Sequence, residues 1–380
     1  KWNALGGAPG DATGAVTTIT GGMYKNYVNG RLYWNQSANE VYWVHGAILD
    51  KYLVSGGPQA FGLPTSDESP VPNGIASARM NTFTGGNIYW SAATTAHIVY
   101  GAILNKYPSL TATLGLPATD VYGISVPGSP GAQQCILQYG RVYTDGTTPN
   151  THEVHGDILS KYLVSGGPQA FGLPTSDEKD VPGITSLAKM NDFQSAGIYW
   201  SPLTSAHIVY GAILTKYLAM TGDGTDYHTF GLPLTDETGV PGYAPGRKTE
   251  FQNATIYWSS ATGAHEVHGE IRSKWLALGG PVRFGLPTSD ELDATIVIGV
   301  PRKWNQFQYA NVYWSLATGA HEVHGAIRDK YVAQVSAGGA GGHLGILGLP
   351  ITDEYPLALP GGAARSAFQH GFVTWWAPYG

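Results

Sequence analysis

Three kinds of side chain that could take part in chemistry recur at a regular spacing along the sequence. An aspartate carboxylate can accept hydrogen bonds from sugar hydroxyls or bind a cation. The flat face of a tryptophan can stack on a sugar ring, and a histidine can move a proton or bind a metal. Trp34 and Trp90, for example, lie 56 positions apart (90 − 34) in a chain of 380 residues.

The aspartates follow a Gly-Leu-Pro turn in six segments. They are Asp67, Asp120, Asp177, Asp236, Asp290 and Asp353. Two interpretations stay open: the carboxylate binds a ligand, or it accepts hydrogen bonds from backbone N–H groups of its own turn. We retain Asp67, Asp177, Asp236, Asp290 and Asp353 as ligand-binding candidates. The glutamate that follows most of these aspartates is replaced by Val121 in the third segment.

A tryptophan ends a Tyr-Trp pair in most segments. The five are Trp34, Trp90, Trp200, Trp258 and Trp314. Adjacent residues of a strand face opposite sides, so one ring of each pair is expected in the core and the other outside. An outward indole predicts a stacking platform for sugars, whereas an inward one would fill the space between neighbouring units. The third segment has Tyr143-Thr144 instead.

A histidine precedes each predicted helix. The ligand-binding candidates are His97, His207, His265 and His321, with His152 at the same position of the third segment. A second histidine three residues later gives His-Glu-Val-His in some segments, but Tyr100 and Tyr210 replace it in others. Histidines three apart in a strand face opposite sides, so no metal site and no cofactor is predicted. The alternative role is a hydrogen bond to a neighbouring turn.

The elements that position these residues can be predicted from one repeated segment, which covers residues 44–68 and returns almost unchanged at 154–178. Val44, Ile48 and Tyr52 are four residues apart, as on one face of a short helix. A Gly-Gly pair then ends the helix, and a tight Gly-Leu-Pro turn follows. The pieces FQNATIYW and AHEVHG predict two strands of a hairpin. Each unit is therefore expected to hold a hairpin, a short helix and a turn.

The two ends of the chain suggest that the units close into a ring. Residues 1–7 match residues 274–280, so the sequence begins inside a unit, and residues 368–375 resemble a hairpin strand. A ring closed by its first and last segments accounts for a unit that is divided between both ends. We predict one mainly β domain with short helices, a closed β-propeller-like ring of seven units. The expected units are 24–77, 78–130, 131–186, 187–246, 247–301 and 302–363, with the seventh formed by 364–380 and 1–23.

Composition excludes several classes of function. The net charge is −6, and only 13% of residues are charged. No block of Lys or Arg occurs, so no nucleic-acid partner is expected. No apolar run is long enough to span a membrane, and residues 1–7 show no signal peptide. Cys135 is the single cysteine, so no disulfide forms within the chain.

The FGLP, LGLP and GAIxxKY elements resemble the LGFP tandem repeat, and the resemblance covers essentially the whole chain. That family is found in secreted and cell-envelope proteins of mycolic-acid bacteria and streptomycetes, and in fungi. The resemblance implies an extracellular or wall-associated binding role, often beside a hydrolase or mycolyltransferase domain. It supplies no shared catalytic residue that can be placed on this sequence.

An enzyme needs one asymmetric set of residues in different roles, whereas the polar candidates here recur in almost every unit. No Gly-x-Ser-x-Gly, phosphate loop or His-Glu-x-x-His is present. We therefore predict a non-enzymatic, lectin-like protein that binds glycans, such as cell-wall polysaccharide, in clefts between neighbouring repeats. One alternative is a glycan hydrolase that uses unit-specific carboxylates, such as Asp157, Asp192 or Glu250. The other alternative is a protein-binding structural ring.

Overall fold

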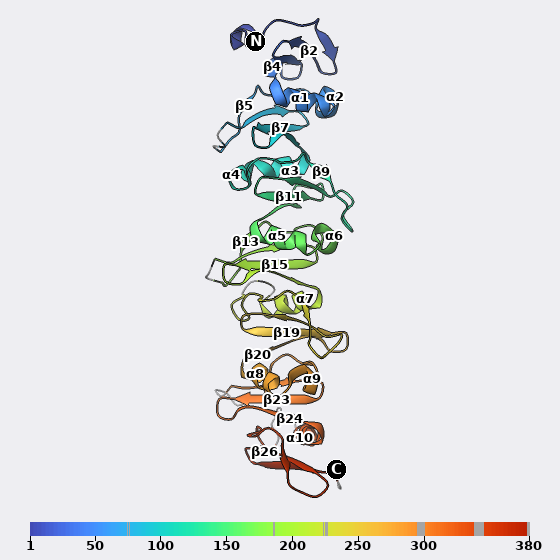
Figure 1. Cartoon of the computed structure of the whole chain (residues 1–380), viewed down its shortest axis with the longest axis vertical. Helices are drawn as coiled ribbons and strands as arrows, with labels where there is room; N and C mark the ends of the chain where they lie inside the picture. The colour runs from blue at the N-terminus through green and yellow to red at the C-terminus, as the bar shows by residue number, and fades with distance from the viewer. Residues whose placement is uncertain are drawn as a thin grey trace. The chain divides into compact units, whose positions relative to one another are not determined.

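The computed structural model describes residues 1–73, 75, 77–184, 187–222, 224, 227–294, 301–337 and 346–377. It divides into two compact units, each considered by itself. The first comprises residues 1–179 and 190–198, and the second comprises residues 180–189 and 199–380. Figure 1 shows short helices alternating with small sheets along the chain in both units.

The described strands form seven small antiparallel sheets, each made of consecutive strands. The first three sheets are β1 (Thr17–Ile19), β2 (Gly22–Tyr27), β3 (Gly30–Asn35) and β4 (Glu40–Val44); β5 (Ser69–Pro70), β6 (Arg79–Phe83), β7 (Gly86–Ser91) and β8 (Thr95–Val99); and β9 (Tyr122–Gly123), β10 (Gln133–Ile136), β11 (Gly140–Thr144) and β12 (Thr151–His155). The fourth contains β13 (Lys179–Asp180), β14 (Lys189–Asp192), β15 (Ala196–Ser201) and β16 (Ser205–Tyr210).

The fifth and sixth sheets repeat this pattern, and the seventh has three strands. They are β17 (Thr238–Gly239), β18 (Arg247–Glu250), β19 (Ala254–Ser259) and β20 (Gly263–His268); β21 (Leu292–Asp293), β22 (Arg302–Gln306), β23 (Ala310–Ser315) and β24 (Gly319–His324); and β25 (Tyr355–Leu357), β26 (Ala363–Phe368) and β27 (Gly371–Trp376). The predicted mainly β fold with short helices is confirmed.

A helix follows each of the first six sheets, and often a second short helix follows the first. The α-helices are α1 (Gly46–Val54), α2 (Gly57–Phe61), α3 (Gly101–Lys106), α4 (Thr111–Leu114), α5 (Gly156–Val164), α6 (Gly167–Phe171), α7 (Gly211–Met220), α8 (Gly269–Ala277), α9 (Gly280–Phe284) and α10 (Gly325–Ala337). Two 3-10 helices, η1 (Asn3–Leu5) and η2 (Tyr107–Ser109), complete the described helical elements.

Each unit was expected to hold a two-stranded hairpin, but most of the described sheets contain four strands. The predicted piece FQNATIYW ends in β19, and AHEVHG lies in β20, so both expected strands exist. Two further strands, such as β17 and β18, extend the hairpin into a meander. The outermost strand is often only two residues long. That is too short to show the alternation of polar and apolar residues from which strands are predicted.

Each core is a helix packed between two sheets. In the first unit, α1 contacts β3 of the preceding sheet and β7 and β8 of the next one. Ile48 and Tyr52 of α1 are buried there with Phe83 and Ile88. In the second unit, α8 packs in the same way against β20, β23 and β24. The predicted helical face of the repeat is therefore confirmed as the core face.

One aromatic residue of each long helix also fixes the Gly-Leu-Pro turn. The Tyr52 hydroxyl donates a hydrogen bond of 2.5 Å to the Gly62 carbonyl oxygen, and Tyr217 and Tyr331 bind Gly231 and Gly348 in the same way. The turn needs glycine at this point because its φ is positive. At Gly285, φ is +72°, and a Cβ would lie 2.6 Å from Gln308 Cβ.

The predicted ring closure is not confirmed by the strand pairings. Strand β1 pairs with β2, and β2 with β3, so residues 17–27 belong to the first sheet. Strand β27 pairs with β26 in the last sheet. Each of these two sheets is built from its own consecutive strands. That residues 1–23 and 364–380 complete one unit together stays a prediction.

Candidate functional site

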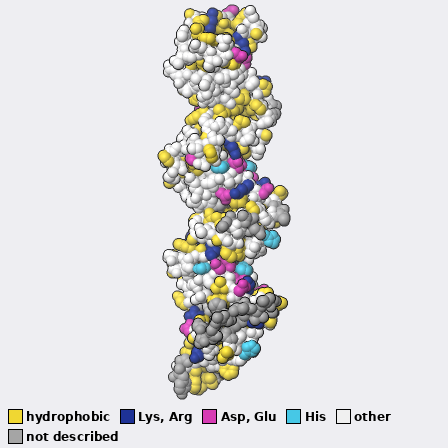
Figure 2. All heavy atoms as spheres, turned by 180° about the vertical axis from the view of Figure 1, so that it is seen from behind, with side chains coloured by type: hydrophobic (Ala, Val, Ile, Leu, Met, Phe, Trp, Pro, Cys, Tyr) yellow, Lys and Arg dark blue, Asp and Glu magenta, His cyan; other side chains and the backbone are white. Residues whose placement is uncertain are grey.

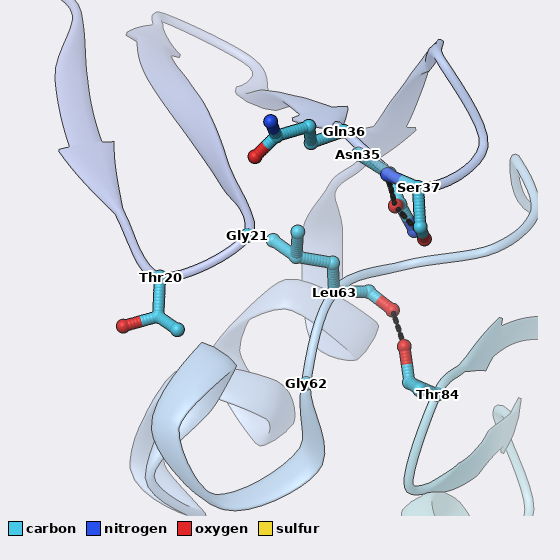
Figure 3. A pocket seen from close by; sticks show the side chains of 8 residues that line it. All are labelled: Thr20, Gly21, Asn35, Gln36, Ser37, Gly62, Leu63 and Thr84. Atoms are coloured by element: carbon cyan, nitrogen blue, oxygen red, sulfur yellow. Dashed lines mark hydrogen bonds between the residues drawn. The ribbon is translucent and has the colours of Figure 1, made fainter.

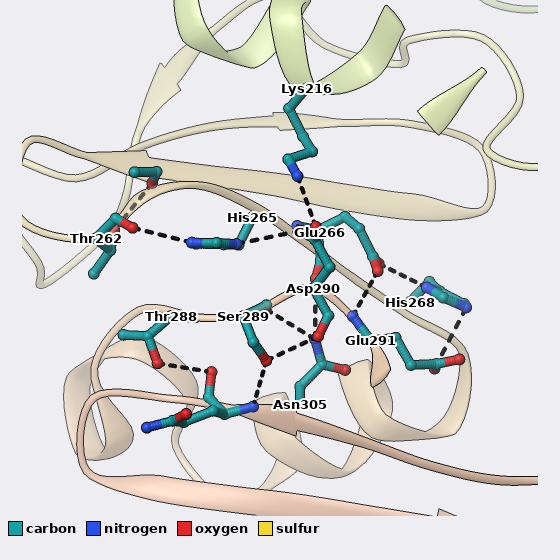
Figure 4. A network of polar contacts seen from close by, with 12 residues as sticks. Lys216, Thr262, His265, Glu266, His268, Thr288, Ser289, Asp290, Glu291 and Asn305 are labelled. Carbon is teal, nitrogen blue, oxygen red and sulfur yellow. Dashed lines mark hydrogen bonds and ion pairs between the residues drawn. The ribbon is translucent and has the colours of Figure 1, made fainter. Parts of the chain in front are cut away.

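The recurrent aspartate joins two successive repeats, as the network around Asp290 shows (Figure 4). Its Oδ1 accepts hydrogen bonds from the backbone N–H of Glu266 at 3.3 Å and from His265 Nδ1 at 3.2 Å. Its Oδ2 accepts one from Lys216 Nζ at 2.6 Å. Lys216 lies on α7, before the fifth sheet, while Asp290 follows α9. The carboxylate thus binds the helix on one side of the sheet to the turn on the other.

The same arrangement recurs in both units. The described lysine–aspartate pairs are Lys1–Asp67, Lys51–Asp120, Lys106–Asp177, Lys216–Asp290 and Lys274–Asp353. The histidine partners of the aspartates are His97, His152, His207, His265 and His321. The aspartate and histidine candidates therefore contact each other. The histidine binds a neighbouring turn, as its alternative role expects, whereas Asp290 accepts from the backbone N–H of Glu266 on β20, outside its own turn.

These contacts stabilise the ionised form of the carboxylate. Burial raises the pKa of Asp290, but hydrogen bonds from His265 and Lys216 outweigh it and bring the pKa down to about 2. The pKa of Asp120 and of Asp353 is lowered to about 2 by the same kinds of partner. The unfolded chain binds protons more readily at these groups. Their contribution to stability is therefore complete above pH 4 and is lost as the pH falls towards 2.

The histidine in this network faces an acceptor at each ring nitrogen. His265 Nε2 lies 3.0 Å from the Thr262 carbonyl oxygen, and Nδ1 faces Asp290. His321 has the same two partners, Thr318 O and Asp353. A neutral imidazole carries only one N–H, so both contacts become hydrogen bonds only when the ring is doubly protonated.

A second cluster was missed at the sequence level: a buried glutamate paired with the histidine two residues after it. Glu266 is 1% exposed and accepts a hydrogen bond from His268 Nδ1 at 2.7 Å and one from the Glu291 backbone N–H at 2.8 Å. His268 Nε2 lies 3.4 Å from a carboxylate oxygen of Glu291. Equivalent clusters are Glu153–His155–Glu178 and Glu322–His324–Glu354.

The sequence did contain a signal for this cluster. Where the buried glutamate is present, a histidine follows two positions later, as at His155, His268 and His324. Where Ile98 or Ile208 replaces the glutamate, Tyr100 or Tyr210 replaces the histidine. In these five repeats the two positions change together, because a buried carboxylate needs a hydrogen-bond donor and an isoleucine does not. The first repeat differs, since it holds Trp43 and His45.

The glutamate–histidine clusters predict a pH dependence of stability. The hydrogen bond to Glu266 raises the pKa of His268, and burial raises the pKa of Glu291. Both groups bind protons more tightly in the folded chain, so stability falls as the pH rises through their folded pKa values. We expect the melting temperature to decrease by about 2 to 4 °C between pH 6 and pH 8, measured by calorimetry.

The matched control copies the residues of sister repeats. The double variant Glu266→Ile, His268→Tyr gives the fifth repeat the pair that Ile208 and Tyr210 form in the fourth. It removes one of the clusters, so its melting temperature should decrease less between pH 6 and pH 8 than that of the parent chain. An unchanged decrease in this variant would mean that other groups cause the pH effect.

The tryptophans occupy one register position on the third strand of the sheet. In every described pair the tyrosine is buried, as expected for one ring of the pair, but the tryptophan is half-buried rather than outside. Trp90 and Trp314 pack against clusters of buried core residues. Trp258 has Arg247 opposite it on one neighbouring strand and Ala264 on the other. Trp90 lies between Arg79 and Ala96, and Trp314 between Lys303 and Ala320. Each of these three indoles thus has a basic residue on one side and a small residue on the other.

The glutamate of the turn holds this basic residue. Glu237 Oε1 accepts a hydrogen bond from Arg247 Nε at 2.8 Å, and Glu68 lies 3.8 Å from Arg79 Nε. Glu291 lies 3.7 Å from Lys303 Nζ. In the third sheet all three positions differ together, since they hold Val121, Gln133 and Thr144. Glutamate, basic residue and indole thus occur together around Trp90, Trp258 and Trp314, whereas Trp34 lies opposite Met23 and has no basic partner at this position.

Trp34 lies in a different environment. It lines a hollow of ≈ 410 Å³ with Trp2, Met23 and Tyr27. Lys1 and Trp2 match the end of α8, Lys274 and Trp275. In the fifth repeat that helix covers the corresponding face of the next sheet. The hollow at Trp34 therefore corresponds to core space in later repeats. The seventh sheet also carries a tryptophan at the register position, Trp375, opposite Ala364.

The surface charge is mixed. On the face drawn in Figure 2, basic, acidic and histidine side chains gather in small groups of both signs. Within the described residues, no group of His, Cys, Asp and Glu has an arrangement that could hold a metal ion. No described helix is both long and apolar enough to cross a membrane.

A known repeat family matches most of the chain. The LGFP repeat matches residues 7–59, 61–112, 171–224, 230–282 and 284–339. This chain belongs to the LGFP-repeat family. The matches leave out residues 113–170, which include the third sheet with its altered positions. No curated protein matches the sequence of this LGFP-repeat chain.

Solved structures give only distant similarities to this LGFP-repeat chain. Two are extracellular domains of one- and two-component systems of B. thetaiotaomicron, at 9% and 8% identity, each with a TM-score of 0.15. A third is PorZ, a surface component of the type-IX secretion system of Porphyromonas gingivalis, at 6% identity with a TM-score of 0.13. This chain spans 41%, 41% and 37% of their lengths. At such scores the similarity carries no argument about function.

Proposed function

We propose that this LGFP-repeat chain is a multivalent glycan-binding protein of the extracellular space or cell surface. Its binding positions are the half-buried indoles of successive sheets. The supporting observation is the set of glutamate, basic residue and indole around Trp90, Trp258 and Trp314. All three positions hold other residues in the third sheet.

The set has the chemistry that sugars need. The indole face stacks on the C–H face of a pyranose, and the small alanine beside it leaves room for the ring. Arg247 or Lys303 can donate hydrogen bonds to hydroxyl groups at the edge of the same ring. The glutamate fixes the basic side chain, which reduces the entropy lost on binding.

The aspartate and histidine candidates take a supporting role in this proposal. Asp290 already accepts three hydrogen bonds, and His265 contacts an acceptor through each ring nitrogen. They hold the strand and turn that carry the indole, so they are positioning residues. Cell-wall polysaccharide is a suitable target because a repetitive polymer can engage several sites of one chain.

The alternative of a glycan hydrolase has less support. Two of its unit-specific carboxylates are engaged in ion pairs: Asp192 with Lys179 at 2.5 Å and Glu250 with Lys248 at 2.5 Å. No observation favours the other alternative, a protein-binding ring. Closure of seven units into a ring stays a prediction, which small-angle X-ray scattering of the full chain can test.

The proposal predicts that Trp258→Ala weakens glycan binding. Loss of a stacking face is expected to reduce the affinity of that site about two- to twelve-fold, because aromatic contacts contribute about 0.5 to 1.5 kcal/mol beyond their buried area. The measurement is a glycan array followed by titration with the best-bound glycan. Trp258→Phe should retain part of the binding.

Tyr309→Ala is the matched control, since Tyr309 is an aromatic residue that is 60% exposed on a hairpin turn and lies outside the set. It should bind as the parent chain does. Equal binding by Trp258→Ala and Tyr309→Ala would contradict the stacking role. Absence of any bound glycan, together with hydrolysis of a polysaccharide, would favour the enzyme.

A further inference from the structure

The connection between the first two strands of the first sheet is unusually short. Only residues 20–21 join β1 to β2. In the third sheet residues 124–132 join β9 to β10, and in the fifth sheet residues 240–246 join β17 to β18. The difference lies inside the first sheet and is independent of the chain ends.

The longer connections cover the helical segment that follows their own sheet. In the second sheet, the Asn73 side chain donates a hydrogen bond of 3.0 Å to Thr111 Oγ1 of α4. In the third, the Gln169 side chain of α6 donates to the Ser125 carbonyl oxygen. At the corresponding helix of the first repeat, α2, this connection is only the two-residue turn of Thr20 and Gly21.

A hollow of ≈ 870 Å³ opens at this place, between β1 and the segment 56–59. A second hollow of ≈ 380 Å³ lies at the other side of the same turn and shares Thr20 and Gly62 with the first. Figure 3 shows the second hollow, with Thr20 and Gly21 facing Leu63 and Gly62. Together the two hollows offer space for more than one sugar ring.

The larger hollow is lined by one charged side chain, Arg31. Its guanidinium lies 4.8 Å from the centre of the Tyr24 ring, which holds it in place by a cation–π contact. No carboxylate among the described residues forms an ion pair with Arg31, whereas the basic residue beside Trp258 is paired with Glu237. A fixed and unneutralised guanidinium favours an anionic ligand group, which it can bind through two parallel N–H donors.

The rest of the lining is neutral and rich in hydrogen-bonding groups. Thr18 and Thr20 provide hydroxyls, Gln59 provides a carboxamide, and Gly56 leaves its backbone accessible. Such groups both donate and accept, as an array of sugar hydroxyls requires.

We infer that the first repeat carries a separate site for a saccharide that bears an anionic group, either a uronic-acid carboxylate or a phosphate. The inference rests on the proposed glycan-binding function but uses none of the indole sets. The chain would then have one charged site in addition to the neutral indole sites. An acidic heteropolysaccharide would bind to both kinds of site.

Calorimetric titration of the full chain tests the site, with trigalacturonic acid, glucose 6-phosphate and the neutral maltotriose as probes. Trigalacturonic acid or glucose 6-phosphate should bind to the parent chain. Arg31→Gln should reduce the affinity for that probe about ten-fold or more. Whichever acidic probe binds more tightly identifies the source of the anion. A variant in which residues 240–246 replace Thr20 and Gly21 should close the hollow and also lose binding.

Arg365→Gln is the matched control, because Arg365 also lies over a ring, that of Phe372 at 4.1 Å, and lines neither hollow. It should bind the acidic probes normally. Equal affinity of the parent chain and Arg31→Gln, or no binding of either acidic probe, would overturn the inference. Trp258→Ala should leave binding of the acidic probe intact, which separates this site from the indole sites.

Discussion

Trp275→Ala is expected to destabilise the second unit by about 3 to 5 kcal/mol, the cost of removing a large buried aromatic side chain. Trp275 is 0% exposed on α8. Its ring stacks on Phe307 with centroids 4.8 Å apart and contacts Tyr257 edge-on at 5.1 Å. Its loss would leave a cavity between two sheets. Urea unfolding followed by circular dichroism, with hydrogen exchange to locate the loosened repeats, measures the effect.

Trp275→Tyr is the control for this variant and should be nearly neutral. The other long helices carry tyrosine at this position, with the hydroxyl donating to the glycine carbonyl of the turn. Trp275 Nε1 is buried without a hydrogen-bond partner in the described structure. The tyrosine hydroxyl can donate a hydrogen bond to the Gly285 carbonyl oxygen. This bond offsets part of the stability that is lost with the smaller buried area. A loss as large as that of Trp275→Ala would contradict the idea of interchangeable repeats.

Asp290→Ala is expected to cost about 2 to 3 kcal/mol, since it leaves Lys216, His265 and the Glu266 backbone N–H without their acceptor. The contact joins α7 to the turn after α9, so hydrogen exchange should increase on both sides of the fifth sheet. A denaturant titration gives the free energy of unfolding. It should be made at pH 7, where the carboxylate is ionised in both the folded and unfolded chain.

Asp293→Ala is the matched control for Asp290. Asp293 also forms an ion pair, with Lys303 at 2.7 Å, but its side chain is 76% exposed. Exposed ion pairs contribute little, so its loss should cost less than about 1 kcal/mol. If both variants lower the free energy of unfolding by the same small amount, the aspartate network does not hold the repeats together.

The repeat and its local elements were predictable from the sequence, because each has a local signal. The helix of residues 46–54 shows apolar residues four apart, and glycines mark its end. Alternation along the strand predicted that one ring of each Tyr-Trp pair is more buried than the other. The altered third repeat was visible at Val121 and Thr144, and the structure adds Gln133 between them.

Contacts between repeats were not predictable in the same way. Lys216 and Asp290 are 74 positions apart, and no local pattern in the sequence connects them. The edge strands of two residues carry no periodicity. The hollow beside Thr20 results from a shorter connection, and only the three-dimensional position of α2 shows what that connection leaves uncovered.

The number of ligand molecules bound per chain tests the central claim most directly. Calorimetric titration with a short neutral glycan, chosen from the array, should give several equivalent weak sites, up to one for each of Trp90, Trp200, Trp258 and Trp314. Trp258→Ala should lower that number by one while the remaining sites keep their affinity. A single site per chain, or a number that Trp258→Ala leaves unchanged, would contradict multivalent binding through the repeated indoles.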